Sequence, residues 1–219
     1  MSTIRVAVVA YEGFNELDVF ANLHILNRVT RVRPEVALRA ELVGPAEVVR
    51  SMYGVPVTTA RPLAAALADG AADAVVVGSG GTLDAIADEA FMAELAHLDP
   101  GRRLIGSQCS GALVLQRLGL LGDRPACTDD TFRPHLEAAG VTVLDQPFVA
   151  HGNVGTAGGC LSAAHLSAWV LSRLVDAEAA AATLATVAPV GEREAFVARV
   201  MDQIGAADHA PVGPVGPVG

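Results

Sequence analysis

The sequence predicts an α/β fold, namely a three-layer sandwich with a mostly parallel central sheet and a nucleophile elbow. Apolar strand-like runs alternate along the chain with segments of helical apolar spacing, a pattern that is typical of βα units. Residues 4–10 are almost continuously apolar, as expected of a parallel strand that is buried on both faces. A third observation is that small, polar or glycine-rich segments follow several of these runs, at the strand ends where such folds bind ligands.

The elements follow one another in an order that fits this fold. The predicted strands are residues 4–10, 36–43, 74–77, 104–107, 141–144, 148–150 and 154–157, with a small hairpin over 47–50 and 55–58. The predicted helices are residues 16–29, a helix beginning near Thr82, and residues 91–98, 112–121, 131–139, 161–175, 178–187 and 192–204. We expect one domain over residues 1–205. Residues 206–219, which end in repeats of Gly-Pro-Val, are expected to form a flexible tail.

Composition limits the classes of function. The chain has 219 residues, 52% hydrophobic and 18% charged, which is enough apolar material for one sizeable core. Its formal net charge is −9, and its basic residues form no cluster larger than Arg28, Arg31 and Arg33. Since nucleic-acid binding needs a basic face that neutralises phosphates, we expect no nucleic-acid partner. No apolar run reaches membrane-spanning length, so we expect no membrane partner either.

The cysteines are Cys109, Cys127 and Cys160. An odd number of widely spaced cysteines argues against a disulfide framework and against a zinc site, and it fits a reducing compartment. The N-terminus enters a strand without a signal-peptide layout, so we expect a cytoplasmic protein. Small or apolar neighbours indicate that Cys127 and Cys160 are thiols of the hydrophobic core.

Cys109 is the strongest candidate for chemistry. The apolar run before it leads directly into the cysteine, and small residues followed by a helical pattern come after it. This is the sequence pattern of a strand–nucleophile–helix elbow, in which the N-terminus of the helix faces the sulfur and favours the thiolate. A buried cysteine at a tight turn is the alternative interpretation.

Two further strand ends carry candidate residues. Residues 78–81, Gly-Ser-Gly-Gly, can present backbone N–H groups to a ligand as in an oxyanion hole, or can be a plain strand–helix loop. Glu16 and Asp18 begin the first predicted helix, where carboxylates commonly serve as caps. The functional alternative is that one of them reaches Cys109 and exchanges a proton with the thiol.

The histidines offer no metal site, because no two of the six have the spacing of a ligand pair on one helix face. His165 follows Gly158-Gly159-Cys160 near the start of a long helix. We expect it on the helix surface, with an approach to the site as the alternative.

Taken together, these segments resemble the ThiJ/PfpI superfamily, whose fold is that of class I glutamine amidotransferases. The resemblance covers roughly residues 4–175 in the expected order, and its matching segments are residues 6–18, 75–81, 106–112 and 148–159. It implies that Cys109 is the reactive cysteine and that Asp18 is the acidic residue hydrogen-bonded to it. It also implies an oxyanion hole at Gly80, Gly81 and the backbone N–H of Ser110, and a homodimer.

The departures from the family pattern bear on function. Protease-type members carry a histidine directly after the nucleophile, where this chain has Ser110. Many other members carry a histidine in the segment after the elbow helix, where this chain has Asp129. A Cys–His triad is therefore not expected, and neither is protease activity. The segments around Asp18 and Cys109 are closest in style to isocyanide hydratases.

Several functions remain open at this point. The first is a hydratase or lyase, with no cofactor or metal, that acts on a small-molecule electrophile; Cys109 is its nucleophile, Asp18 its proton shuttle and Ser110 an additional hydrogen-bond donor. The second is a glyoxalase-like enzyme that acts on 2-oxoaldehydes, which needs a base to move a proton between carbons. The third is a non-catalytic redox sensor, because an activated thiol beside a carboxylate also stabilises a sulfinic acid. A small-molecule binding domain that has lost activity is the fourth.

Overall fold

A seven-stranded sheet forms the centre of the molecule in the computed structural model, which describes residues 3–68 and 70–207. Its strands are β1 (Ile4–Val9), β2 (Leu38–Gly44), β5 (Arg61–Pro62), β6 (Ala74–Val77), β7 (Leu104–Gln108), β8 (Phe148–His151) and β9 (Val154–Ala157). They are ordered β5-β2-β1-β6-β7-β9-β8, and every neighbouring pair is parallel except β8 and β9. The hairpin of β3 (Val48–Arg50) and β4 (Pro56–Thr58) forms a separate two-stranded sheet.

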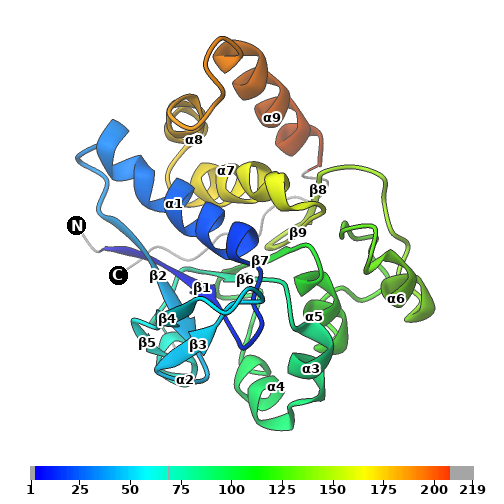
Figure 1. Cartoon of the computed structure of the whole chain (residues 1–219). Coiled ribbons are helices and arrows are strands. Elements are labelled where there is room, and N and C mark those ends of the chain that lie inside the picture. Colours follow the sequence, from blue (N-terminus) through cyan, green and yellow to red (C-terminus); the bar gives the residue numbers. More distant parts are fainter. Residues whose placement is uncertain (1–2, 69, 208–219) are drawn as a thin grey trace.

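Helices cover both faces of the sheet, as Figure 1 shows. One face carries α1 (Glu16–Val32), α7 (Ala163–Leu174), α8 (Ala177–Ala185) and α9 (Arg193–Ala207). The other carries α2 (Leu63–Leu67), α3 (Thr82–Ala87), α4 (Glu89–Leu95) and α5 (Gly111–Arg117), and α6 (Arg133–Ala138) contacts α5. The predicted three-layer α/β sandwich is confirmed.

The alternation of side chains along β1 explains why residues 6–9 of this strand are all apolar. Val6 and Val8 point into the core beneath α1 and α7, whereas Ala7 and Val9 point into the core on the opposite face. All four side chains are fully buried. A strand that has helices on both faces has no side for polar residues, so its sequence shows no period of two.

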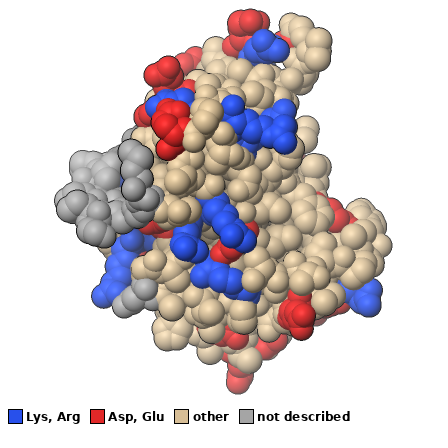
Figure 2. All heavy atoms as spheres, turned by 90° about the vertical axis from the view of Figure 1, so that its left-hand side faces the viewer, with Lys and Arg blue, Asp and Glu red and all other residues tan. Residues whose placement is uncertain are grey.

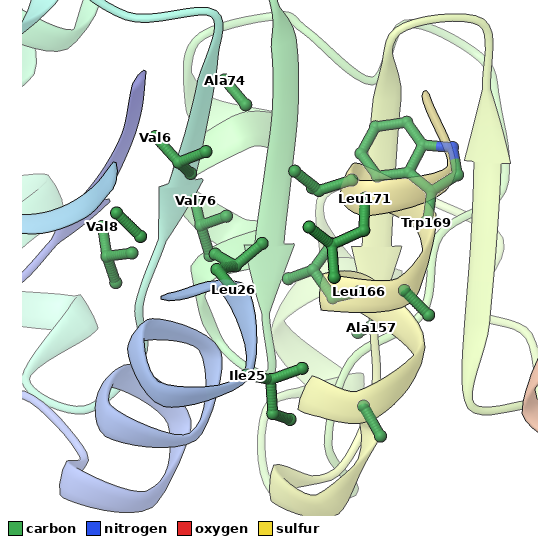
Figure 3. Close-up of a cluster of buried hydrophobic side chains, with 14 of the residues drawn as sticks. Val6, Val8, Ile25, Leu26, Ala74, Val76, Ala157, Leu166, Trp169 and Leu171 are labelled. Atoms are coloured by element: carbon green, nitrogen blue, oxygen red, sulfur yellow. The ribbon is translucent and has the colours of Figure 1, made fainter. Parts of the chain in front are cut away.

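Figure 3 shows how the first of these cores is filled. Val6, Val8, Ala74 and Val76 come from neighbouring strands and lie beneath helix side chains. Those helix side chains are Ile25 and Leu26 from α1, and Leu166, Trp169 and Leu171 from α7. This packing fixes α1 and α7 relative to the strand ends that carry the site.

Several sequence-based boundaries differ from the structure. Residues 141–144 form no strand of the sheet; Val143 makes one isolated bridge with Ala126, a residue of a loop. A single bridge to a loop does not extend into a ladder, so this run forms no strand, and of its four residues only Val141 is buried. Helix α5 ends at Arg117 rather than at residue 121, because Gly119 with φ +74° turns the chain away. The short elements β5 and α2 were not predicted.

The expected end of the domain at residue 205 stays a prediction. Helix α9 continues to Ala207, two residues past the expected end of the domain at residue 205. The rest of the expected tail, residues 208–219, lies outside the described residues.

Figure 2 shows arginines and acidic side chains lying near one another on one face of the molecule. Glu41, whose side chain is 8% exposed, is ion-paired with Arg61 and, at 3.3 Å, with Arg39.

Within the described residues, no helix has the length and apolar character that crossing a membrane requires.

Candidate active site

The site lies at the carboxyl ends of three neighbouring strands, β1, β6 and β7. In the sheet, β2 lies on one side of β1, and β6, the next strand to join the sheet beside β1, lies on the other side. The chain thus changes direction across the sheet at β1. Folds of this class bind ligands at such a switch point. The loop after β1 is held against the loop after β6 by two backbone bonds. The Asn15 N–H donates to the Ser79 carbonyl at 2.8 Å, and the Gly81 N–H donates to the Gly13 carbonyl at 2.9 Å.

Cys109 occupies the sharp turn between β7 and α5. Its φ of +49° lies in the left-handed region, and it is the one non-glycine residue with positive φ in the described part of the chain. Such a conformation costs a residue with a Cβ about 1–2 kcal/mol and persists only where the surrounding structure enforces it. Here the Cys109 N–H donates to Ala157 O at 2.8 Å, and Thr128 Oγ1 donates to Cys109 O at 2.9 Å. The predicted elbow is therefore present, with its cysteine 3% exposed.

Asp18, Cys109 and Cys160 converge in this site. One carboxylate oxygen and the two sulfur atoms all lie within 4.8 Å of one another. The Asp18 side chain is fully buried; Ser79 Oγ donates to its Oδ2, while its Oδ1 makes no hydrogen bond among the described residues. The free Oδ1 can accept a proton from a thiol, and the three groups together could also ligate a thiophilic cation.

The position of Cys160 corrects the sequence interpretation, which placed this thiol in the hydrophobic core. It lies in a short 3-10 helix (Cys160–Ser162), directly after Gly159 with φ +81°, and it is partly exposed. Asn15 Nδ2 donates to its sulfur at 3.7 Å. Cys127, in contrast, is fully buried, as predicted.

The electrostatics of the site favour the protonated thiols. Burial, followed by the charge of Asp18 and a hydrogen bond to it, raises the pKa of Cys109. Burial and Asp18 also raise the pKa of Cys160. A helix N-terminus is worth only about 0.3–1 kcal/mol to a nearby anion, so α5 does not offset these effects. The expected preference for the thiolate is therefore wrong for the resting site, whose burial and negative charge favour the protonated form of Cys109.

Burial of thiols also predicts a loss of stability at alkaline pH. Burial raises the pKa of Cys127 from 9.0 to about 12, so its contribution to folding is complete below pH 9 and is lost as the pH rises to about 12. We expect the free energy of unfolding to fall above pH 9, by about 1.4 kcal/mol per pH unit for each such group. Urea unfolding at pH 8, 9 and 10 measures this decline. It should be shallower for Cys127→Ala, and parallel curves for the two proteins would contradict the assignment.

A buried chain of amide and hydroxyl groups supports Cys109 from the side of α1. Gln108 Nε2 donates to the Cys109 sulfur at 3.8 Å and to Gly159 O at 2.8 Å. Asn22 Nδ2 donates to Gln108 Oε1 at 3.3 Å, and Ser167 Oγ donates to Asn22 Oδ1 at 2.9 Å. The Gln108 side chain thus joins the two segments that carry Cys109 and Cys160.

Ser110 belongs to a second chain of hydroxyl groups. The Tyr11 hydroxyl donates to Gly78 O at 3.1 Å and lies 2.9 Å from Thr82 Oγ1, which in turn lies 2.6 Å from Ser110 Oγ. Because the proton of Tyr11 goes to Gly78, we infer that Thr82 donates to Tyr11 and Ser110 to Thr82. Burial raises the pKa of Tyr11 well above its usual value, so its hydroxyl keeps the proton that it donates to Gly78 O.

The expected oxyanion hole is only partly open. The Gly81 N–H is occupied by Gly13 O, so it is not available to a substrate oxygen. The Gly80 N–H makes a long bond of 3.4 Å to Ser110 Oγ. Gly80 and the backbone N–H of Ser110 therefore remain as the candidate donors.

The family assignment follows from a comparison of the sequence with family models. The DJ-1/PfpI family model matches residues 4–172. The chain belongs to the DJ-1/PfpI family. No curated protein matches it. The resemblance to the ThiJ/PfpI superfamily that the sequence motifs indicated is thus confirmed.

Solved structures of this family share its fold. A ThiJ/PfpI family protein from Pseudomonas syringae superimposes with a TM-score of 0.73 at 22% identity, covering 95% of this chain and 90% of that protein. Schizosaccharomyces pombe DJ-1 gives 0.70 at 20% identity, covering 85% and 100%. Oxidised Toxoplasma gondii DJ-1 gives 0.71 at 19% identity, covering 84% and 98%. At these identities the likeness concerns the fold alone.

In this DJ-1/PfpI chain, two of the secondary candidates serve local structure. The carboxylate of Glu16 interacts with Ser51 and with the backbone of Tyr53 in the β3–β4 hairpin, and these contacts lower its pKa. His165 Nε2 is hydrogen-bonded at 2.7 Å to Gln203 on α9, and burial lowers its pKa. His165 therefore lies between α7 and α9 rather than on the helix surface.

Asp129 lies closer to the site. Its Oδ1 accepts the N–H groups of Thr131 and Phe132, at 3.0 and 3.2 Å, so one carboxylate oxygen is used to cap the turn before α6. It also contributes to the negative potential that raises the pKa of Cys109. It lines a cleft of about 490 Å³ that adjoins the elbow through Thr128 and Gly159, with Asp130, Arg133, Leu144, Asp145, Gln146, Pro147 and Gly158 as the other lining residues.

The glycines of the loop after β6 serve close packing. A Cβ on Gly80 would lie 2.2 Å from Gly13 O, at a φ of +123°. We expect Gly80→Ala to lower the free energy of unfolding by roughly 2–4 kcal/mol and to displace the Ser110 network. The matched control is Gly140→Ala, at φ +83° with open space around it, which should cost about 1 kcal/mol. Equal losses for the two variants in urea unfolding would contradict the role of the close contact.

Proposed function

We propose that this protein is a cysteine-dependent hydratase that acts, without a cofactor, on small electrophiles of the isocyanide class. The observation that carries the proposal is the pairing of an elbow cysteine with a buried carboxylate that has a free oxygen. No histidine joins this group among residues 3–68 and 70–207. A thiol and a carboxylate can add to an electrophilic carbon and exchange one proton, whereas hydrolysis of a peptide also needs an acid for the leaving amine.

The first step forms a carbon–sulfur bond. The thiol proton of Cys109 passes to Asp18 as the sulfur attacks the terminal carbon of the isocyanide. Asp18 then returns that proton to the same carbon, which gives a thioimidate bound to Cys109. The raised pKa of Cys109 suits this step, because the thiolate is created only when the substrate carbon is there to take its charge.

The second step uses water. Asp18 accepts a proton from a water molecule as the water oxygen attacks the thioimidate carbon. Asp18 gives that proton to the thioimidate nitrogen. The carbon–sulfur bond then breaks as the remaining hydroxyl proton passes to the Cys109 sulfur, and the product leaves as an N-substituted formamide. The sum is one isocyanide plus one water to one formamide, with the enzyme unchanged. Gly80 and Ser110 offer backbone N–H groups to the oxygen that forms at this carbon.

Mass spectrometry combined with product analysis tests the proposal. The reduced protein is mixed with an alkyl isocyanide, and separately with methylglyoxal, and the products are followed by NMR. We expect catalytic formation of the formamide, with a transient adduct on Cys109. Cys127→Ala, which leaves the site intact, should behave like the wild-type protein, whereas Cys109→Ala should form neither product nor adduct. Turnover of methylglyoxal alone would overturn the isocyanide proposal in favour of a glyoxalase-like enzyme.

A further inference from the structure

The site contains a second thiol that the proposed hydration does not use. Cys109 is carried by the turn between β7 and α5, and Cys160 by the turn between β9 and α7. Their sulfur atoms nevertheless lie within 4.8 Å of each other, beside the same carboxylate. A disulfide has a sulfur–sulfur bond of about 2 Å, so the two atoms need to approach by less than roughly 3 Å.

The structure holds the two cysteine-bearing segments together. The Cys109 N–H donates to Ala157 O at 2.8 Å, and Gln108 Nε2 bridges the Cys109 sulfur and Gly159 O. Gly159 has φ +81° and open space around it, and the helix that follows it begins with a short 3-10 turn. The backbone next to Cys160 can therefore adjust without displacing β9 or α7.

The two thiols also differ in exposure. Cys109 is 3% exposed, whereas Cys160 is partly open to solvent and its sulfur accepts a hydrogen bond from Asn15. A hydrogen bond donated to sulfur stabilises the thiolate, which is the attacking form in disulfide chemistry. One carboxylate oxygen of Asp18 lies within 4.8 Å of both sulfur atoms, so this carboxylate can take the proton that either thiol must lose.

We propose that Cys160 is a resolving cysteine, which forms an intramolecular disulfide with Cys109 after a hydroperoxide has oxidised one of the pair. The inference rests on the proposed function for the reactivity of Cys109. It adds that the disulfide reversibly blocks this nucleophile.

The chemistry balances with the hydroperoxide as oxidant. The Cys109 thiolate attacks the terminal peroxide oxygen, which gives a sulfenic acid and, from hydrogen peroxide, water. The Cys160 thiolate then attacks the sulfenic sulfur, the sulfur–oxygen bond breaks, and a second water leaves. Two thiols and one peroxide become one disulfide and two waters. Without Cys160, the sulfenic acid can react with a second peroxide to give the sulfinic acid, which dithiothreitol does not reduce.

Thiol counting and intact mass on the full chain test this directly. The wild-type protein, Cys160→Ser and Cys127→Ala are each treated with a small excess of hydrogen peroxide at low protein concentration. We expect the wild-type protein to lose two titratable thiols and two hydrogen atoms, and to remain a single chain on a non-reducing gel. Cys127→Ala should also lose two thiols. Dithiothreitol should restore the thiols of both the wild-type protein and Cys127→Ala.

Cys160→Ser should instead gain two oxygen atoms on Cys109, and dithiothreitol should not reverse this change. Gain of two oxygens by the wild-type protein, or a linkage that persists in Cys160→Ser, would overturn the inference. These readouts use no substrate, so a disulfide in a protein without hydratase activity would refute the proposed function alone. Hydration by a protein that forms no disulfide would refute the resolving role alone.

Discussion

Replacing Cys109 with glycine is expected to lower turnover by roughly four orders of magnitude or more. The same variant is expected to be more stable than Cys109→Ala. The loss of activity follows from the loss of the nucleophile. The gain in stability follows from the φ of +49°, because glycine adopts the left-handed region freely whereas alanine retains the conflict of its Cβ with the backbone. We expect a difference of about 1 kcal/mol in favour of glycine.

Cys127 provides the matched control for this comparison. It is buried like Cys109, and its backbone does not have positive φ. At that position glycine should be less stable than alanine, by about 0.5–1 kcal/mol. Urea unfolding of the four variants should therefore show opposite orders at residues 109 and 127. The same order at both positions would mean that the elbow stores no strain, and that the geometry at Cys109 is not maintained for function.

The arrangement of the sheet could be predicted because it follows from local patterns. The run of residues 6–9 is apolar on both faces, which requires helices on both faces, and the glycine-rich and polar segments follow the strand ends. Parallel strands place those ends at one edge, so the approach of Glu16 or Asp18 to Cys109 could be expected from sequence, and the family resemblance favoured Asp18, which the structure places there.

The rest of the site depends on contacts that no local pattern carries. Cys160 has small, apolar neighbours typical of a core thiol, but the positive φ of Gly159 turns it toward Asp18. The hydrogen bond from Ser79 to Asp18 joins residues 61 positions apart. The glycines at 80 and 81 suggested free N–H groups, whereas the structure uses their lack of a Cβ to bring the loop against Gly13 and Glu12. Spacing in a sequence does not reveal which purpose a glycine serves.

Asp18→Asn is expected to slow hydration by about 10²–10⁴-fold, because an amide cannot accept and return the proton of Cys109. Asparagine has the shape of aspartate, and its carbonyl oxygen can still accept the hydrogen bond from Ser79, so the fold should be retained. Steady-state kinetics on an isocyanide measures the loss, and urea unfolding verifies the stability. Unchanged kcat would contradict the role of Asp18 as the proton shuttle.

Alkylation of Cys109 provides a second readout, and its rate should change in the opposite direction to the rate of hydration. It therefore distinguishes a role of Asp18 in proton transfer from a merely structural role. The charge of Asp18 contributes to the raised pKa of Cys109, so its removal should lower that pKa and increase the thiolate population at neutral pH. The pH profile of iodoacetamide alkylation should shift to lower pH in Asp18→Asn, while hydration becomes slower. Asp129→Asn is the matched control: it keeps an oxygen for Thr131 and Phe132, and its charge is the smallest contributor to that pKa. Its profile should shift far less. A damaged site would slow both reactions, whereas loss of the proton shuttle alone makes the sulfur easier to alkylate and less able to complete the hydration.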